Sequence, residues 1–93
     1  MVAALVMIKA QTDKVSDVAA ELTGIGGVSE VFSVAGQWDL VAIVRVRDND
    51  DLAAVVTDRI RKVPGIVGSE TMIAFRSYSR SEVEAGFSLG IED

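Results

Sequence analysis

Two stretches of this chain are dominated by apolar residues, and they limit its possible folds more than any other feature. Residues 2–10 read VAALVMIKA and residues 40–47 read LVAIVRVR. Both are far too short to span a bilayer and are rich in β-branched residues, so each predicts a strand buried on both faces. A chain of 93 residues forms one domain, which must build its other segments around these two strands.

The rest of the chain predicts two helices and two more strands. Apolar residues recur at helical spacing in two segments, namely Val15, Val18, Ala19, Leu22 and Ile25, and Leu52, Val55, Val56, Ile60 and Val63. Thr12 is expected to cap the first helix, and Asp48 with Asn49 the second. Glycines at 24, 26 and 27 end the first helix, and Pro64-Gly65 ends the second. Residues 28–35 and 66–77 then form the second and fourth strands.

The resulting order, β-α-β-β-α-β, predicts a ferredoxin-like α+β sandwich. Right-handed crossovers place both helices on one face of an antiparallel sheet with strand order 4-1-3-2, so the two most apolar strands are central. Residues 1–77 form this domain. The more polar tail, residues 78–93, is expected to hold a short helix at an oligomer contact.

The sheet face without helices is also expected to be apolar. Leu5 and Met7 point to one face of the first strand, and Val6 and Ile8 point to the other. An isolated monomer would carry polar residues on the uncovered face. The sequence therefore predicts a homodimer, packed sheet on sheet or with exchanged edges, and the alternative is that the tail folds back over this face.

Composition excludes several kinds of function. The net charge is −5 and the basic residues are scattered from Lys9 to Arg80, which argues against direct nucleic-acid binding. The chain contains no histidine and no cysteine, so triads, disulfides and the usual zinc ligands are absent, and a cytoplasmic location fits. Acids at 48, 50 and 51 lack calcium-loop spacing and suit a helix N-terminus. No catalytic residue, metal, cofactor, signal peptide or membrane span is expected.

The segment Gly36-Gln37-Trp38-Asp39 interrupts the apolar run between the second and third strands. Asp39 has two interpretations: it caps an ordinary turn by bonding nearby amides, or it binds a ligand ammonium while loop amides bind a ligand carboxylate. Trp38 is either an anchor of a dimer interface or a ligand contact. Thr71 is a common strand residue when considered alone.

Taken together, these segments resemble the effector-binding (RAM) domain of the Lrp/AsnC transcription regulators. The resemblance covers residues 2–76 and rests on Val31, the Gly36-x-x-Asp39 loop with the apolar strand after it, and Pro64-Gly65-Ile66 shortly before Thr71. It implies dimers that assemble into an octameric or decameric ring and bind an amino acid or related metabolite between dimers. By position it assigns effector-binding roles to Gly36, Gln37, Trp38, Asp39, Ser69 and Thr71. Trp38 departs from the tyrosine more familiar at its position.

The function expected from this resemblance is a non-enzymatic regulatory module. Full-length members of the family place a helix-turn-helix before this domain, whereas this chain begins at the first strand and is similar to stand-alone forms. It would act through oligomer assembly or by joining full-length Lrp/AsnC regulators. The alternative is a small dimeric α+β-barrel enzyme, a cofactor-free monooxygenase or isomerase, because such enzymes share the topology. A purely structural oligomeriser is a third possibility.

Overall fold

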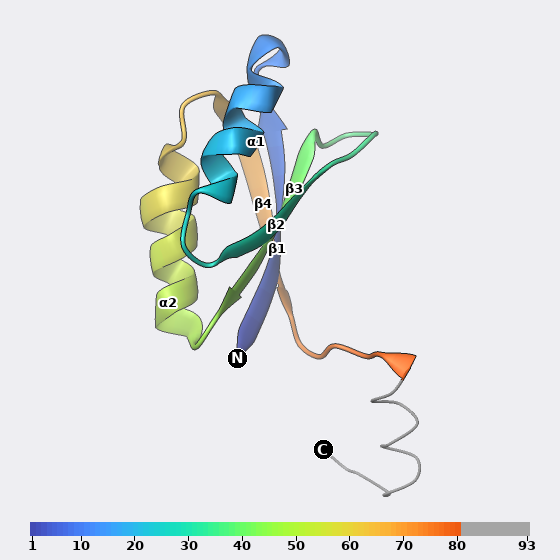
Figure 1. Cartoon of the computed structure of the whole chain (residues 1–93), viewed down its shortest axis with the longest axis vertical. Helices are drawn as coiled ribbons and strands as arrows, with labels where there is room; N and C mark the ends of the chain where they lie inside the picture. The colour runs from blue at the N-terminus through green and yellow to red at the C-terminus, as the bar shows by residue number, and fades with distance from the viewer. Residues whose placement is uncertain (81–93) are drawn as a thin grey trace, which may run out of the picture.

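The computed structural model describes residues 1–80 and contains the helices and strands in the expected order. The elements are β1 (Val2–Ala10), a 3₁₀ turn η1 (Thr12–Lys14), α1 (Val15–Thr23), β2 (Val28–Ser33), β3 (Leu40–Val46), α2 (Asn49–Ala53), its π-helical continuation η2 (Ala54–Arg59), a 3₁₀ turn η3 (Ile60–Lys62) and β4 (Ile66–Ala74). The sheet is antiparallel with the order β2-β3-β1-β4, which confirms the predicted ferredoxin-like topology. Both helical segments cover the same face of the sheet (Figure 1).

The hydrophobic core lies between this face and the helices. Val6 of β1 is paired with Ala42 of β3 and with Thr71 of β4, so all three side chains share the helix-covered face. Val6 and its neighbour on the same face, Ile8, are 0% exposed. The helices contribute buried side chains at Val18, Leu22, Leu52, Val55, Ile60 and Val63. The predicted helical stripes and the central position of the two apolar strands are therefore confirmed.

Three predicted strand ends are wrong by one to three residues. β2 ends at Ser33 rather than Ala35 because Ser33 pairs with Leu40, the first residue of β3. β4 ends at Ala74 rather than Ser77 because Ala74 pairs with Ala3, almost at the start of β1. The third strand, β3, likewise stops one residue early, at position 46. In each edge strand the partner strand sets the end, and the local sequence does not encode it.

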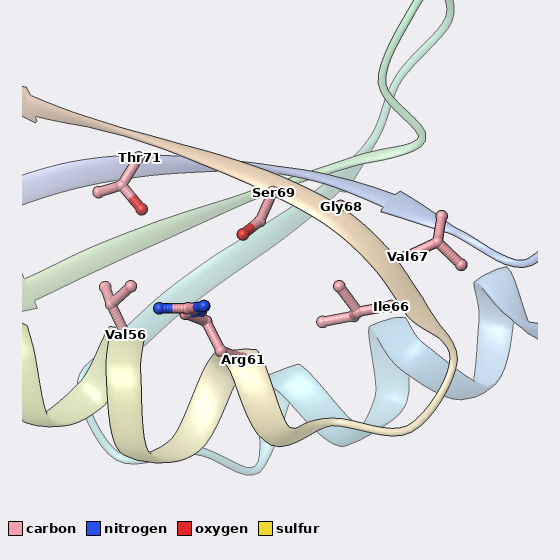
Figure 2. A pocket seen from close by; sticks show the side chains of 7 residues that line it. All are labelled: Val56, Arg61, Ile66, Val67, Gly68, Ser69 and Thr71. Atoms are coloured by element: carbon pink, nitrogen blue, oxygen red, sulfur yellow. The ribbon is translucent and has the colours of Figure 1, made fainter.

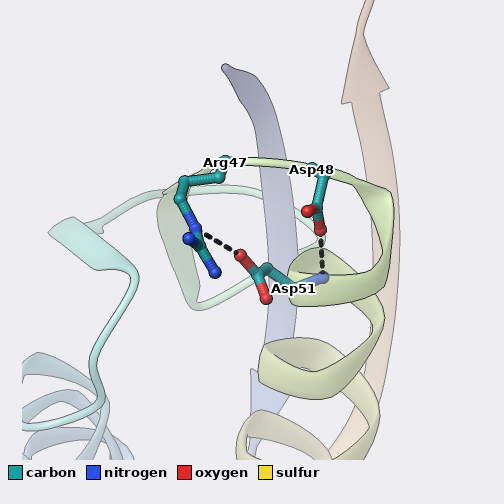
Figure 3. A network of polar contacts seen from close by, with 3 residues as sticks. All are labelled: Arg47, Asp48 and Asp51. Carbon is teal, nitrogen blue, oxygen red and sulfur yellow. Dashed lines mark hydrogen bonds and ion pairs between the residues drawn. The ribbon is translucent and has the colours of Figure 1, made fainter.

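The two predicted helix caps have different outcomes. Asp48 caps α2, since its Oδ1 accepts a hydrogen bond of 2.8 Å from the backbone N–H of Asp51, while Arg47 Nε donates to Asp51 Oδ2 at 3.1 Å (Figure 3). The prediction for Thr12 is wrong: it lies inside η1, and neither η1 nor α1 has a side-chain cap. The 3₁₀ turn moves the start of the α-helix to Val15, beyond the reach of the Thr12 hydroxyl.

Each helix is joined to the next strand through a glycine with the same backbone conformation. Gly27 before β2 and Gly65 before β4 both have φ of 98°, which L side chains rarely adopt. A Cβ at Gly65 would also lie 2.9 Å from Cγ2 of Val18. The glycines thus allow two close approaches, and at Gly65 the end of the second helical segment meets α1.

The opposite side of the sheet carries a second set of apolar residues, which we call the open face. It consists of Phe32, Val41, Ile43, Leu5, Met7 and Met72, which are paired with one another across the four strands. Phe32 is 49% exposed and Met72 is 47% exposed. Residues 75–80 lead away from the sheet (Figure 1), and Phe75 is 98% exposed, so they do not cover this face. The dimer remains a prediction, and most of the predicted tail helix, residues 81–93, lies outside the described residues.

Candidate functional site

Asp39 links the loop between β2 and β3 to strand β1 by hydrogen bonds. Its carboxylate Oδ2 accepts a hydrogen bond of 2.9 Å from the Ala10 N–H, and its own N–H donates to the carbonyl of Ile8 at 2.9 Å. The other carboxylate oxygen lies 3.8 Å from Nζ of Lys9, and the Asp39 side chain remains 26% exposed. Asp39 therefore holds the loop against β1, and its side chain is still partly exposed to solvent.

The tip of the same loop offers accessible backbone. Gly36 has φ of 114°, and no atom lies within 4 Å of the place where a Cβ would stand. Gly36 and Gln37 are exposed, whereas Trp38 is half buried. The backbone at Gly36 is thus open on the side where a Cβ would stand, and a small ligand can approach it there.

Ser69 and Thr71 lie elsewhere, on the helix-covered face of β4. Ser69 pairs with Ile8 and Thr71 with Val6, yet both are exposed because β4 is an edge strand. They line a pocket of about 450 Å³ between β4 and the second helical segment, which we call the β4 pocket (Figure 2). Its lining residues are Val56, Arg61, Ile66, Val67, Gly68, Ser69 and Thr71.

Arg61 is the pocket residue that sequence reasoning missed. It belongs to η3, directly after the fully buried Ile60, and its guanidinium extends toward the hydroxyls of Ser69 and Thr71 (Figure 2). In the sequence it is one of two neighbouring basic residues at the end of a helix, a common arrangement that gives no sign of a site. Only the packing of η3 beside β4 brings it to the pocket.

The structure divides the six predicted site residues into two groups within one chain. Ser69 and Thr71 share the β4 pocket, and none of the loop residues lines it. Asp39 instead pairs with Lys9, a residue whose partner on β4 is Gly68 and which belongs to the other face of the sheet. Strand β1 and the plane of the sheet thus separate the two groups in one chain.

The polar and charged side chains of the described residues are all at least partly exposed. Among residues 1–80 no charged or polar side chain is buried, whereas an acid–base enzyme places its carboxylates in sheltered surroundings. No group of three or more acids that could hold a metal ion occurs in this range. None of the helices described is long and apolar enough to cross a membrane.

The fold defines the class of protein as a ferredoxin-like α+β sandwich. A family model narrows this class: the model of the Lrp/AsnC ligand binding domain matches residues 3–84. The chain therefore belongs to the Lrp/AsnC ligand-binding domain family. This result confirms the resemblance drawn from the Gly36-x-x-Asp39 loop and the Pro64-Gly65-Ile66 segment.

Three relatives illustrate the similarity. The chain is 28% identical to the HTH-type transcriptional regulator FL11 of Pyrococcus abyssi over 78 residues, which are 84% of this chain and 51% of that protein. The crystal structure of TTHA0845 from Thermus thermophilus superposes with a TM-score of 0.81 and 39% identity, over 86% of this chain and 100% of that one. The feast or famine regulatory protein Rv3291c from M. tuberculosis, complexed with L-methionine, gives a TM-score of 0.71 and 28% identity, over 86% and 54%.

The curated relatives are longer than the matched region. This chain spans 39% of the length of one of them and 51% of another, and both are named as HTH-type transcriptional regulators. The relatives found by sequence are thus named as transcriptional regulators, and this chain matches only part of their length.

Proposed function

We propose that this chain is a regulatory module that binds an amino acid and responds by changing its assembly. The observation that carries the proposal is the family match over residues 3–84, a range that includes the Gly36–Asp39 loop and the hydroxyls of Ser69 and Thr71. The L-methionine complex of the related regulator from M. tuberculosis supports an amino acid as the kind of ligand.

The first step of assembly is a homodimer packed through the open face. The centre of this face is apolar, at Leu5, Ile43 and Met72, while Lys9, Glu30, Arg45 and Glu70 occupy its rim. An apolar centre with a charged rim is the usual anatomy of a stable interface. In a two-fold dimer each patch meets its own copy, so basic and acidic rim residues can pair across the contact.

The ligand site is completed where two dimers meet, in a ring of the octameric or decameric kind. The loop and the β4 pocket are separated within one chain, so a single small molecule can touch both only if a second chain supplies one of them. The Asp39 carboxylate then binds the ligand ammonium and the Gly36 amides bind its α-carboxylate.

Regulation follows from the position of the site between chains. A ligand held there stabilises one assembly over another by the difference in its affinity for the two, which is a population shift. Because the related regulators are longer than this chain and match it over part of their length, full-length Lrp/AsnC regulators are the natural partners, with which it would form mixed rings.

The test is a titration of Trp38 fluorescence with each proteinogenic amino acid, repeated on Asp39→Asn. The asparagine oxygen still accepts the hydrogen bond from Ala10. This variant therefore removes the charge and keeps the contact between the Gly36–Asp39 loop and β1. We expect saturable binding of a few amino acids, weakened about tenfold in Asp39→Asn and unchanged in the exposed control Asp13→Asn. A flat response across the panel from folded, oligomeric protein would reject the proposal.

A further inference from the structure

We infer that the β4 pocket receives the side chain of an acidic amino acid and that Arg61 binds its carboxylate. The inference rests on the proposed amino-acid site and adds to it the class of ligand. It depends on three features of the pocket: a guanidinium that makes no hydrogen bond or ion pair within residues 1–80, two hydroxyls at positions where the fold elsewhere places apolar residues, and a described lining that contains no acid.

The guanidinium of Arg61 is available to a ligand. Within residues 1–80 it makes no hydrogen bond or ion pair, although Asp58 lies three residues earlier in the same helical segment. Figure 2 shows it lying between η3 and β4, below the Ser69 and Thr71 hydroxyls. The chain has a net charge of −5, yet Arg61 pairs with no acid among residues 1–80. Its guanidinium is therefore well placed to bind a ligand anion.

The two hydroxyls break the apolar pattern of the helix-covered face. Their partners on β1, Ile8 and Val6, are completely buried, and the same rows continue on β3 as Leu40 and Ala42. Polar side chains at Ser69 and Thr71 therefore contribute nothing to the core. They place two O–H donors beside the N–H donors of the guanidinium, and a carboxylate is the acceptor-only group that suits such a set.

The lining also excludes other side chains. It contains no acidic residue, so a lysine or arginine ligand would place its charge against Arg61 without compensation. Val56 and Ile66 are half buried and form an aliphatic wall, which fits the methylene groups that precede a side-chain carboxylate. A volume of about 450 Å³ is ample for such a group.

The α-carboxylate and the α-ammonium of the ligand bind outside the β4 pocket, at the Gly36–Asp39 loop. The Gly36–Asp39 loop offers backbone amides and a carboxylate, which match the α-carboxylate and the α-ammonium. The β4 pocket offers one positive charge and no negative one, so it matches the single charge of an acidic side chain. Glutamate and aspartate should thus bind more tightly than glutamine and asparagine, which have nearly the same shape without the charge.

The experiment compares these matched pairs by isothermal titration calorimetry on the full chain. For the wild type we expect glutamate or aspartate to bind about tenfold or more tightly than its amide, since hydrogen bonds between charged groups are the stronger ones. Arg61→Ala should remove this preference, and Arg61→Lys should restore part of it because the charge returns without the planar fork. Arg59→Ala is the matched control, since Arg59 is exposed on the same helical segment but lines a separate hollow with Gly26, Arg47 and Asp51.

The outcomes separate the inference from the proposed function. A preference for the acid that is lost in Arg61→Ala and kept in Arg59→Ala supports the inference. Equal binding of acid and amide by the wild type, or a preference that survives in Arg61→Ala, overturns it while the amino-acid site stands. If no amino acid binds to the folded, oligomeric wild type, the proposed function fails and the inference fails with it.

Discussion

The two faces of the sheet both carry apolar side chains but are completed by different means. On the helix-covered face, Val6 and Ile8 are buried by helices of the same chain. On the other, Leu5 and Ile43 carry the same kind of side chain, and none of the described residues forms a layer above them. The comparison teaches that a short chain can encode its own core and an association surface in alternating positions of the same strands.

The largest expected effect on stability is at the core between the helices and the helix-covered face. Leu22→Ala removes a side chain of α1 that is 0% exposed, and we expect it to lower the free energy of unfolding by about 3 kcal/mol, as large-to-small changes in a packed core do. Chemical denaturation at two protein concentrations measures this. Because the contact lies within one chain, the loss should be the same at both concentrations, and a strong concentration dependence would contradict the account.

A charge on the open face should act on association. Ile43→Asp places a carboxylate among apolar side chains that are only half covered in one chain, so the free energy of unfolding of the monomer should fall by less than about 1 kcal/mol while the dimer contact is lost. Sedimentation equilibrium should report the mass of one chain. The control Thr57→Asp, at an exposed helix position, should keep the assembled mass. An assembled mass for Ile43→Asp equal to that of the wild type would show that the open face is not the contact.

A smaller effect on stability is expected at the N-terminal cap of α2, one of the elements on the helix-covered face. Asp48→Ala removes the acceptor of the Asp51 N–H and should cost about 1 kcal/mol of stability. Asp48→Asn keeps an acceptor and should cost only a fraction of that. Thermal unfolding of both variants measures the difference, and equal losses would mean that the capping hydrogen bond is not the cause.

The smallest effect on stability is expected at Thr71, on the helix-covered face of the edge strand β4. Thr71→Val replaces a hydroxyl by a methyl group on an exposed strand position, so stability should change by less than about 0.5 kcal/mol. The affinity for an amino acid, measured by calorimetry, should nevertheless fall, because the pocket loses one donor. An unchanged affinity would place the ligand away from the β4 pocket.

Much of the fold could be predicted from the sequence because the relevant signals are local. Continuous apolar runs identified β1 and β3, and glycine and proline marked the ends of both helical segments. The strand ends at Ser33 and Ala74 could not be predicted, since the length of the partner strand sets them. Thr12 failed as a cap because nothing in its neighbourhood indicates a 3₁₀ turn before α1.

The candidate site could be predicted only in part. The resemblance selected the Gly36–Asp39 loop together with Ser69 and Thr71. In the structure Asp39 accepts a hydrogen bond from the Ala10 N–H of β1, a residue far along the chain, whereas the turn interpretation expected bonds to nearby amides. Arg61 could not be found from the sequence, because its proximity to β4 comes from how η3 packs against the sheet. Sites built from neighbouring elements are specified by packing more than by spacing.

The central claim is that a second chain completes both the open face and the ligand site. The most direct test is calorimetric titration of Ile43→Asp with whichever amino acid binds the wild type, alongside its mass in solution. We predict a single-chain mass and an affinity lowered by about tenfold or more, since the dimers whose contact completes the site no longer form. A folded single chain that binds the amino acid as tightly as the wild type would contradict the account.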